Sequence, residues 1–161
     1  MRAFSASSIS AAILISVVIS SSALASNGNR GLTAVPGLTA SEWAHFQPLT
    51  RQQVQKAYQI VESDPTDANA SGHLGMVLQA YERYLTALVC YQRAQILDPR
   101  SFRWPYYLGT LQAWLGKEPE AVATLQRALQ LDGEYLPARV KLAEVLLAVG
   151  KWEESRKLYE A

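Results

Sequence analysis

The chain has 161 residues, and its 15 basic and 14 acidic side chains give a formal net charge of +1. Nucleic-acid binding draws on clustered Lys and Arg side chains that release counterions from the phosphates, and the sequence has no such cluster. The balanced charge therefore argues against nucleic acids and other polyanions as partners. Cys90 is the only cysteine, so an intramolecular disulfide is excluded and packing must stabilise the fold.

The segment 1–25 has the order of a secretory signal peptide. The lone basic residue Arg2 is followed by an apolar stretch over 9–19 and then by small residues. Signal peptidase accepts only small side chains at the places of Ala23 and Ala25, so we predict cleavage after Ala25. Loss of Arg2 leaves the mature chain with equal numbers of basic and acidic residues.

The alternative, an uncleaved membrane anchor, needs about 20 apolar residues to cross the hydrocarbon core. The stretch 9–19 is shorter, serines interrupt it, and no cysteine directly follows Ala25 to carry a lipid. We therefore expect an exported protein, periplasmic or extracellular, that has no membrane association after cleavage.

Residues 26–48 are small, polar and punctuated by Gly and Pro, which predicts a flexible linker. A short helical turn interrupts the linker, since Thr39 stands three residues before Glu42 in a capping-box arrangement. Trp43 and Phe46 follow this turn. We expect these two aromatic side chains to pack against the first long helix.

The first long helix is predicted within residues 49–67, beginning at Thr50. The Thr50 hydroxyl can cap the amide three residues on, and apolar residues then recur at helical spacing. Asp64 and Pro65 end the helix, because proline disfavours the helical conformation in the residue before it.

From residue 68 onward the sequence repeats with a fixed period, which is the spacing from Gly75 to Gly109. The residues in phase are Gly75, Gly109 and Ala143; Leu74, Leu108 and Leu142; Ala87, Ala121 and Ser155; and Tyr91, Leu125 and Tyr159. The small residues allow two helices of one unit to cross closely, while the leucines and aromatic residues fill the space around them.

These residues resemble the tetratricopeptide repeat (TPR), whose unit follows the pattern W-x2-L-G-x2-Y, then A-x3-F-x2-A and finally P. The resemblance divides the chain into three units, 68–101, 102–135 and 136–161. It implies an all-α fold, a right-handed α-solenoid of antiparallel helix pairs. The helix within 49–67 then takes the place of the second helix of an earlier unit.

Several residues depart from the TPR pattern. Its tryptophan position holds Ser71, Pro105 and Arg139, and its tyrosine position in the second unit holds Gln112. We expect looser or shifted helix packing at these places.

The third unit is truncated within its second helix, and no polar capping helix follows it. Solenoids need such a cap because each repeat buries its apolar side on a neighbour. We therefore expect either that the chain is a fragment of a longer protein or that the uncapped repeat forms a homo-oligomer with a second copy.

The resemblance implies that the first helices of successive units line a concave groove that binds a protein or peptide. By this correspondence the partner-binding groove comprises Asn69, Met76, Gln79, Arg103, Tyr106, Thr110, Trp114 and Glu144, accompanied by Gly72, Ala80, Ala113, Val140 and Lys141.

Arg103, Tyr106 and Trp114 form the best anchor set, because aromatic residues and arginine dominate interface energetics. The alternative, that Tyr106 and Trp114 pack inside the solenoid, stays open, and Tyr107 is expected to be structural. Family members that bind chaperone tails hold the C-terminal carboxylate with a set of Lys and Asn residues. Gly72, Met76 and Tyr107 replace that set here, which disfavours binding of chaperone tails.

No catalytic residue, metal ligand or cofactor is predicted. His45 and His73 lack a second ligand at metal-binding spacing, and Cys90 fits a buried apolar position with no base partner. Phosphate-binding loops and nucleophile elbows are absent from the sequence. We therefore predict a non-enzymatic protein-binding scaffold or adaptor. The alternative is an accessory module of a longer exported enzyme or redox protein whose catalytic part lies beyond residue 161.

Overall fold

The computed structural model describes residues 34–160, which lie within one compact unit. The signal peptide predicted for residues 1–25, with Ala23 and Ala25, and residues 26–33 of the predicted linker lie outside the described residues. Within 34–160 the chain forms eight helices and no strand: α1 (Ala40–Ala44), α2 (Pro48–Ser63), α3 (Ala68–Ala80), α4 (Tyr84–Leu97), α5 (Arg103–Trp114), α6 (Glu118–Leu131), α7 (Leu136–Ala148) and α8 (Trp152–Glu160).

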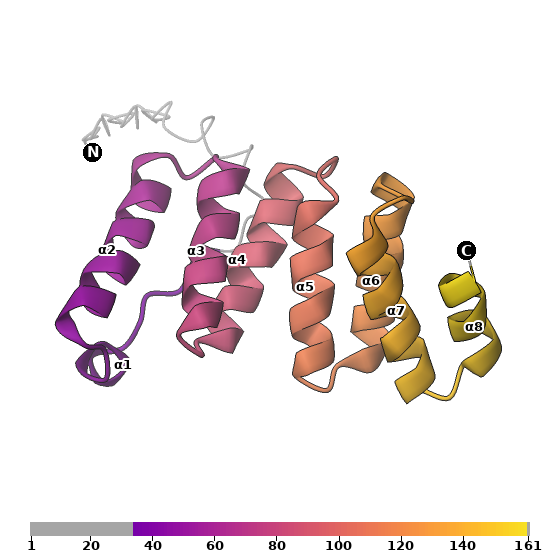
Figure 1. Ribbon diagram of the computed structural model, residues 1–161. Helices are drawn as coiled ribbons and strands as arrows, with labels where there is room; N and C mark the ends of the chain where they lie inside the picture. Colours follow the sequence, from indigo (N-terminus) through magenta and orange to yellow (C-terminus); the bar gives the residue numbers. More distant parts are fainter. Residues whose placement is uncertain (1–33, 161) are drawn as a thin grey trace, which may run out of the picture. The chain divides into compact units, whose positions relative to one another are not determined.

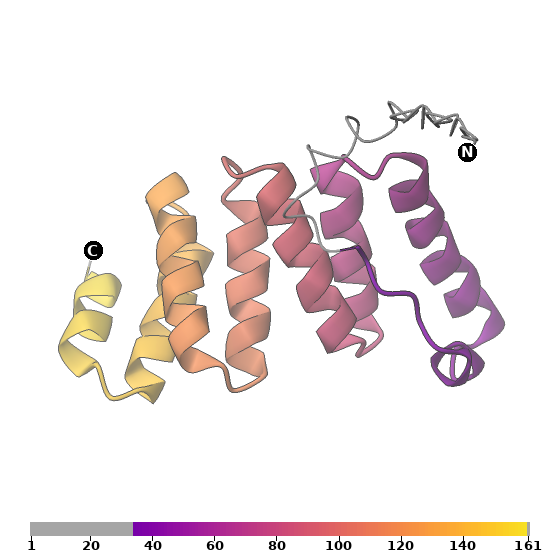
Figure 2. The same ribbon diagram turned by 180° about the vertical axis from the view of Figure 1, so that it is seen from behind.

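The helices from α3 onward pack as antiparallel pairs that follow one another in a row (Figures 1 and 2). α3 pairs with α4, α5 with α6 and α7 with α8, while α4 also contacts α5 and α6 contacts α7. Each unit defined by the sequence period contains one pair, and α2 packs on α3 from the N-terminal side. The predicted all-α solenoid of antiparallel helix pairs is confirmed.

Three helices, α2, α4 and α6, are each followed by an aspartate that closes the next turn. Asp64, Asp98 and Asp132 stand one repeat period apart, and each Oδ1 accepts a hydrogen bond from the backbone N–H two residues on, at 3.0, 3.2 and 3.2 Å. Asp64 follows α2, so α2 ends as α4 and α6 do. This shared turn supports the interpretation of α2 as the second helix of an earlier unit.

α2 begins two residues before the predicted start at Thr50. Pro48 is its first residue, and Gln47 precedes it with an extended backbone and no side-chain cap. Proline suits this place because its fixed φ is helical and its missing N–H would have no partner in the first turn. Thr50 therefore lies inside the helix and caps nothing. The predicted end is confirmed, since α2 stops at Ser63, before Asp64.

The capping box predicted for the short N-terminal helix is confirmed. The Glu42 N–H donates to Thr39 Oγ1 at 3.3 Å, and the Thr39 N–H donates to Glu42 Oε2 at 2.8 Å. This pair begins α1, which directs the chain toward α2 (Figure 1).

The described part of the predicted linker packs on the solenoid. Phe46 is buried, and its ring contacts Trp43 at 5.8 Å and Tyr81 at 5.8 Å between centroids. The Tyr58 hydroxyl donates to the Pro36 carbonyl oxygen at 3.0 Å. The flexible linker predicted for 26–48 therefore does not extend through its final residues, because apolar side chains and a hydrogen bond hold them against α2 and α3.

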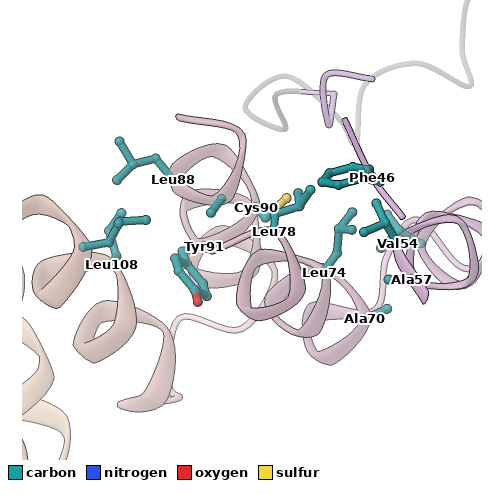
Figure 3. Packing of buried hydrophobic residues seen from close by; sticks show 13 residues of the cluster. Phe46, Val54, Ala57, Ala70, Leu74, Leu78, Leu88, Cys90, Tyr91 and Leu108 are labelled. Atoms are coloured by element: carbon teal, nitrogen blue, oxygen red, sulfur yellow. The ribbon is translucent and has the colours of Figure 1, made fainter. Parts of the chain in front are cut away.

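One hydrophobic core joins α2, α3, α4 and α5 (Figure 3). Leu74, Leu78 and Tyr91 are fully buried in it, together with Cys90. A second, smaller cluster joins α6 to α7 and α8. The periodic leucines and small residues thus lie where the phase of the repeat places them.

Trp104 explains how the structure accommodates the missing tryptophan of the TPR pattern. Its indole is only 3% exposed, although it stands one residue before the tryptophan position held by Pro105. A Cβ atom at Gly72 would lie 2.1 Å from Trp104 Cζ3, so the indole lies directly on the α3 backbone. Gly72 is therefore a packing contact between units and not an open groove position.

The turn between the two helices of each pair uses one backbone conformation in all three units. Glu82, Gly116 and Gly150 have φ of 61°, 70° and 78°. The following N–H donates to a carbonyl oxygen five residues back: Arg83 to Leu78 at 2.8 Å, Lys117 to Gln112 at 2.9 Å and Lys151 to Leu146 at 2.8 Å. This is the Schellman ending of a helix, which requires a left-handed residue and favours glycine.

We predict that substitutions at the left-handed residue of this turn change the free energy of unfolding in opposite directions in the first and second units. Gly116→Ala should lower the free energy of unfolding by about 1 kcal/mol, because a side chain in the left-handed region costs about 1–2 kcal/mol. Glu82→Gly should raise it by up to about 1 kcal/mol, since the strain removed exceeds the added chain entropy. Urea unfolding followed by circular dichroism measures both changes. A loss of stability in Glu82→Gly would contradict the strain assigned to Glu82.

We also predict that Gly72→Ala destabilises the solenoid. The added methyl group meets the buried Trp104 ring, and overpacking costs about 1–3 kcal/mol against a gain of about 1 kcal/mol in helix propensity. A net loss of up to about 2 kcal/mol is expected by urea unfolding. Gly37→Ala is the control, since a Cβ there has no neighbour within 4 Å. Equal stability of Gly72→Ala and the parent chain would show that the indole can move aside.

Candidate partner-binding groove

Two adjoining hollows lie on the first helices of the three units. The larger, here called the aromatic pocket, has a volume of about 490 Å³ and is lined by Met76, Gln79, Ala80, Tyr84, Tyr91, Tyr107 and Trp114. The smaller, the polar pocket, has about 300 Å³ and is lined by Gln79, Thr110, Ala113, Trp114, Glu118, Lys141, Glu144, Val145 and Ala148. Gln79 and Trp114 line both hollows, so together they form one groove across α3, α5 and α7.

The floor of the aromatic pocket is fixed by packing and by one hydrogen bond. The Tyr91 ring is buried and stacks on Tyr107, with centroids 5.7 Å apart and planes 15° apart. Burial raises the pKa of the Tyr91 hydroxyl, which stays protonated and donates to Gln79 Oε1 at 2.8 Å. The orientation of the Gln79 side chain is therefore set by Tyr91.

The rim of the aromatic pocket is open to solvent. Trp114, the last residue of α5, is 72% exposed, and its ring lies 6.5 Å from that of Tyr84 between centroids. An exposed indole of this size offers a large apolar surface that a partner can cover. Trp114 is thus a rim residue and not part of the core.

The polar pocket carries three charged side chains. Lys141 and Glu144 form an ion pair along α7. Glu118 is in the first turn of α6, where the helix dipole favours a negative charge, and it has no ion-pair partner among the described residues. One negative charge is therefore left without an internal partner at this end of the groove.

Five of the eight residues assigned to the groove from the sequence line these two hollows. They are Met76, Gln79, Thr110, Trp114 and Glu144. Asn69 is exposed near the start of α3 and lines neither hollow. Arg103, at the start of α5, lies with its guanidinium carbon 5.7 Å from the centroid of the Trp104 ring.

Tyr106 packs against other side chains of the solenoid and lines neither hollow. Its ring contacts Tyr107 at 5.4 Å and Tyr135 at 5.1 Å between centroids, and Tyr135 in turn contacts Phe102. Tyr106 also packs against the second core cluster. Tyr107, expected to be structural, both stacks on Tyr91 and lines the aromatic pocket.

Sequence reasoning missed Tyr84, Tyr91 and Glu118 as groove residues because it considered only the first helix of each unit. Tyr84 and Glu118 are the first residues of α4 and α6, and they stand one repeat period apart. The repeat period that located the units could have located this pair, since equivalent places in a solenoid face the same groove.

Cys90 is the free cysteine of the described residues, and it is buried. Burial raises the pKa of the Cys90 thiol to about 12, which keeps it protonated and unreactive. No group of His, Cys, Asp and Glu side chains within 34–160 could hold a metal ion. In the same range no helix is both long and apolar enough to pass through a lipid bilayer.

Comparison with known proteins agrees with the repeat. A family model described as the tetratricopeptide repeat matches residues 115–161. The resemblance to the TPR family is confirmed. The chain is also 35% identical over 95 residues to Superkiller protein 3 of Schizosaccharomyces pombe, which covers 59% of this chain and 7% of that protein. The chain therefore spans less than a tenth of the length of this curated relative.

Two solved structures share the TPR arrangement. The crystal structure of MamA superposes with a TM-score of 0.64 at 20% identity, over 71% of this chain and 72% of that one, and it supports the fold alone. The first TPR domain of Spaghetti (RPAP3) gives a TM-score of 0.57 at 25% identity, over 60% of this chain and 77% of that one. That domain is bound to an HSP90 peptide, SRMEEVD.

Proposed function

We propose that the chain is a protein-binding scaffold or adaptor whose groove holds an extended segment of a partner. The pair of hollows that meet at Trp114 carries this proposal. Solenoids of this kind present extended concave surfaces, and the RPAP3 domain shows one TPR structure with a peptide bound. Both hollows lie in or near the size range of sites that hold side chains and small ligands.

Trp114 is the expected anchor of this interaction. Tryptophan, tyrosine and arginine supply most interface energy when a partner covers them, and Trp114 and Tyr84 stand at the rim where a partner would arrive. Tyr91 and Tyr107 are already stacked on each other, so these two side chains lose little conformational freedom when a partner binds. This favours affinity.

We predict that Trp114→Ala weakens partner binding at least about 10-fold, because truncation of an anchor residue costs more than about 1.4 kcal/mol. The measurement compares capture of partners from the envelope fraction of the native cells by the parent and variant chains. Leu85→Ala is the control, since Leu85 is 71% exposed and lines neither hollow. Circular dichroism should be unchanged in both variants. Equal capture by Trp114→Ala and the parent would exclude the groove.

Export before function is a further part of this proposal. It is supported by the apolar stretch 9–19 and by the small residues Ala23 and Ala25 at the places that signal peptidase reads. The partner would then be a periplasmic or extracellular protein.

We predict that the protein isolated from its own cells begins at Ser26. Intact mass and N-terminal sequencing of the native protein measure this directly. Ala25→Tyr should block cleavage, because the peptidase pocket excludes large side chains. Native protein that retains Met1 in the cytoplasm would contradict export.

A second candidate function is that of an accessory module within a longer exported enzyme or redox protein. The observation that favours it is a 26% identity over 121 residues, 71% of this chain, to a probable UDP-N-acetylglucosamine–peptide N-acetylglucosaminyltransferase, SPINDLY, of Hordeum vulgare. Self-association through the third unit is the remaining alternative, where Trp152 and Tyr159 are exposed on α8. Sizing of the purified mature chain tests self-association.

A further inference from the structure

The lining of the aromatic pocket is unusual in its chemistry. Four of its seven residues are aromatic (Tyr84, Tyr91, Tyr107 and Trp114), and none is charged. The faces of aromatic rings carry a partial negative charge and attract Lys, Arg and quaternary ammonium groups. Gln79 Oε1 adds a hydrogen-bond acceptor to the same hollow.

The neighbouring polar pocket has the same electrostatic preference. Its one basic side chain, Lys141, is paired with Glu144, while Glu118 has no ion-pair partner among the described residues. Trp114 lies between the two hollows and lines both. A cation that covers Trp114 would therefore approach a carboxylate without an internal partner.

Two arginines, one of α5 and one of the turn before α4, lie over rings outside the groove. Arg83 directly precedes Tyr84, but its guanidinium carbon lies 5.3 Å from the centroid of the Phe46 ring. Arg103 lies over Trp104 in the same manner. Neither of these two cation–π contacts involves Tyr84 or Trp114, so within residues 34–160 no cation–π contact covers these two rings of the groove.

From these observations we propose that the groove selects a cationic segment of its partner. An arginine or lysine side chain enters the aromatic pocket against Trp114 and Tyr84, and a second basic residue faces Glu118. This inference rests on the proposed protein-binding function of the groove. The proposed partner segment is therefore opposite in charge to the acidic peptide SRMEEVD that is bound to the RPAP3 domain.

Three peptide probes test this preference on the mature chain. All three are labelled octapeptides that contain the same two leucines. They differ only at two other positions, which hold arginine in the first peptide, glutamate in the second and glutamine in the third. Fluorescence anisotropy at low ionic strength should show the tightest binding for the arginine peptide. Binding should weaken as salt is added, because the contact with Glu118 is screened.

Two substitutions of Trp114 separate the attraction of a cation from apolar contact. Trp114→Phe keeps an aromatic face and should retain most of the affinity for the arginine peptide. Trp114→Leu keeps an apolar side chain without that face, and it should weaken binding about 5- to 30-fold. Trp114 is largely exposed, so both variants should fold, and circular dichroism verifies this.

Glu118→Gln tests the second contact. It should weaken binding of the arginine peptide about 2- to 5-fold at low salt and reduce the salt dependence. Glu120→Gln is the matched control, because Glu120 is an exposed residue of the same helical turn that lines neither hollow.

The proposal is overturned if the arginine peptide fails to bind, if the glutamate or glutamine peptide binds as tightly, or if Trp114→Leu binds as Trp114→Phe does. Tight, Trp114-dependent binding of the glutamine peptide would overturn the charge preference while leaving the groove as the binding site. The assignment of the groove as the binding site is contradicted only if Trp114→Ala captures partners as well as the parent chain does.

Discussion

In the first two units the helix pair is closed by a contact between a glycine backbone and a side chain that leaves no room for a larger residue. A Cβ atom at Gly75 would lie 2.8 Å from Tyr91 Cε1, and one at Gly109 would lie 2.7 Å from Leu125 Cγ. In the third unit the Ser155 hydroxyl donates to the Ala143 carbonyl oxygen at 2.8 Å instead. Because the two helices meet this closely, the rotation of the first helix about its axis is fixed, and so is the set of residues that it presents to the groove.

The same contact builds the floor of the aromatic pocket. Tyr91 is held against Gly75 on one side and stacks on Tyr107 of the next unit on the other. Its hydroxyl then reaches Gln79, one turn along α3 from Gly75. Packing that stabilises the fold therefore also orients the polar groups of the groove. Trp114 takes no part in this packing, so its exposed indole is available for contact with a partner.

The repeat architecture could be predicted from the sequence because close packing imposes a small residue at the same place in every unit. Gly75 and Gly109 recur in one phase with several leucines, alanines and aromatic residues, and the helix pairs follow from that phase. Trp104 could not be placed in this way. It stands one residue from the tryptophan position of the TPR pattern, and a shift of one residue rotates a helical side chain by about 100°. The indole consequently lies on Gly72 of the preceding unit, and that contact depends on two residues far apart in sequence.

The groove was only partly predictable for a related reason. The first residue of each second helix occupies one place in the repeat, and Tyr84, Glu118 and Trp152 hold it in turn. Their backbones follow the same Schellman turn, so geometry is shared while the side chains differ in chemistry. The features that repeat determine the shape of the groove. The features that do not repeat, an aromatic ring in one unit and a carboxylate in the next, determine which partner the shape can hold.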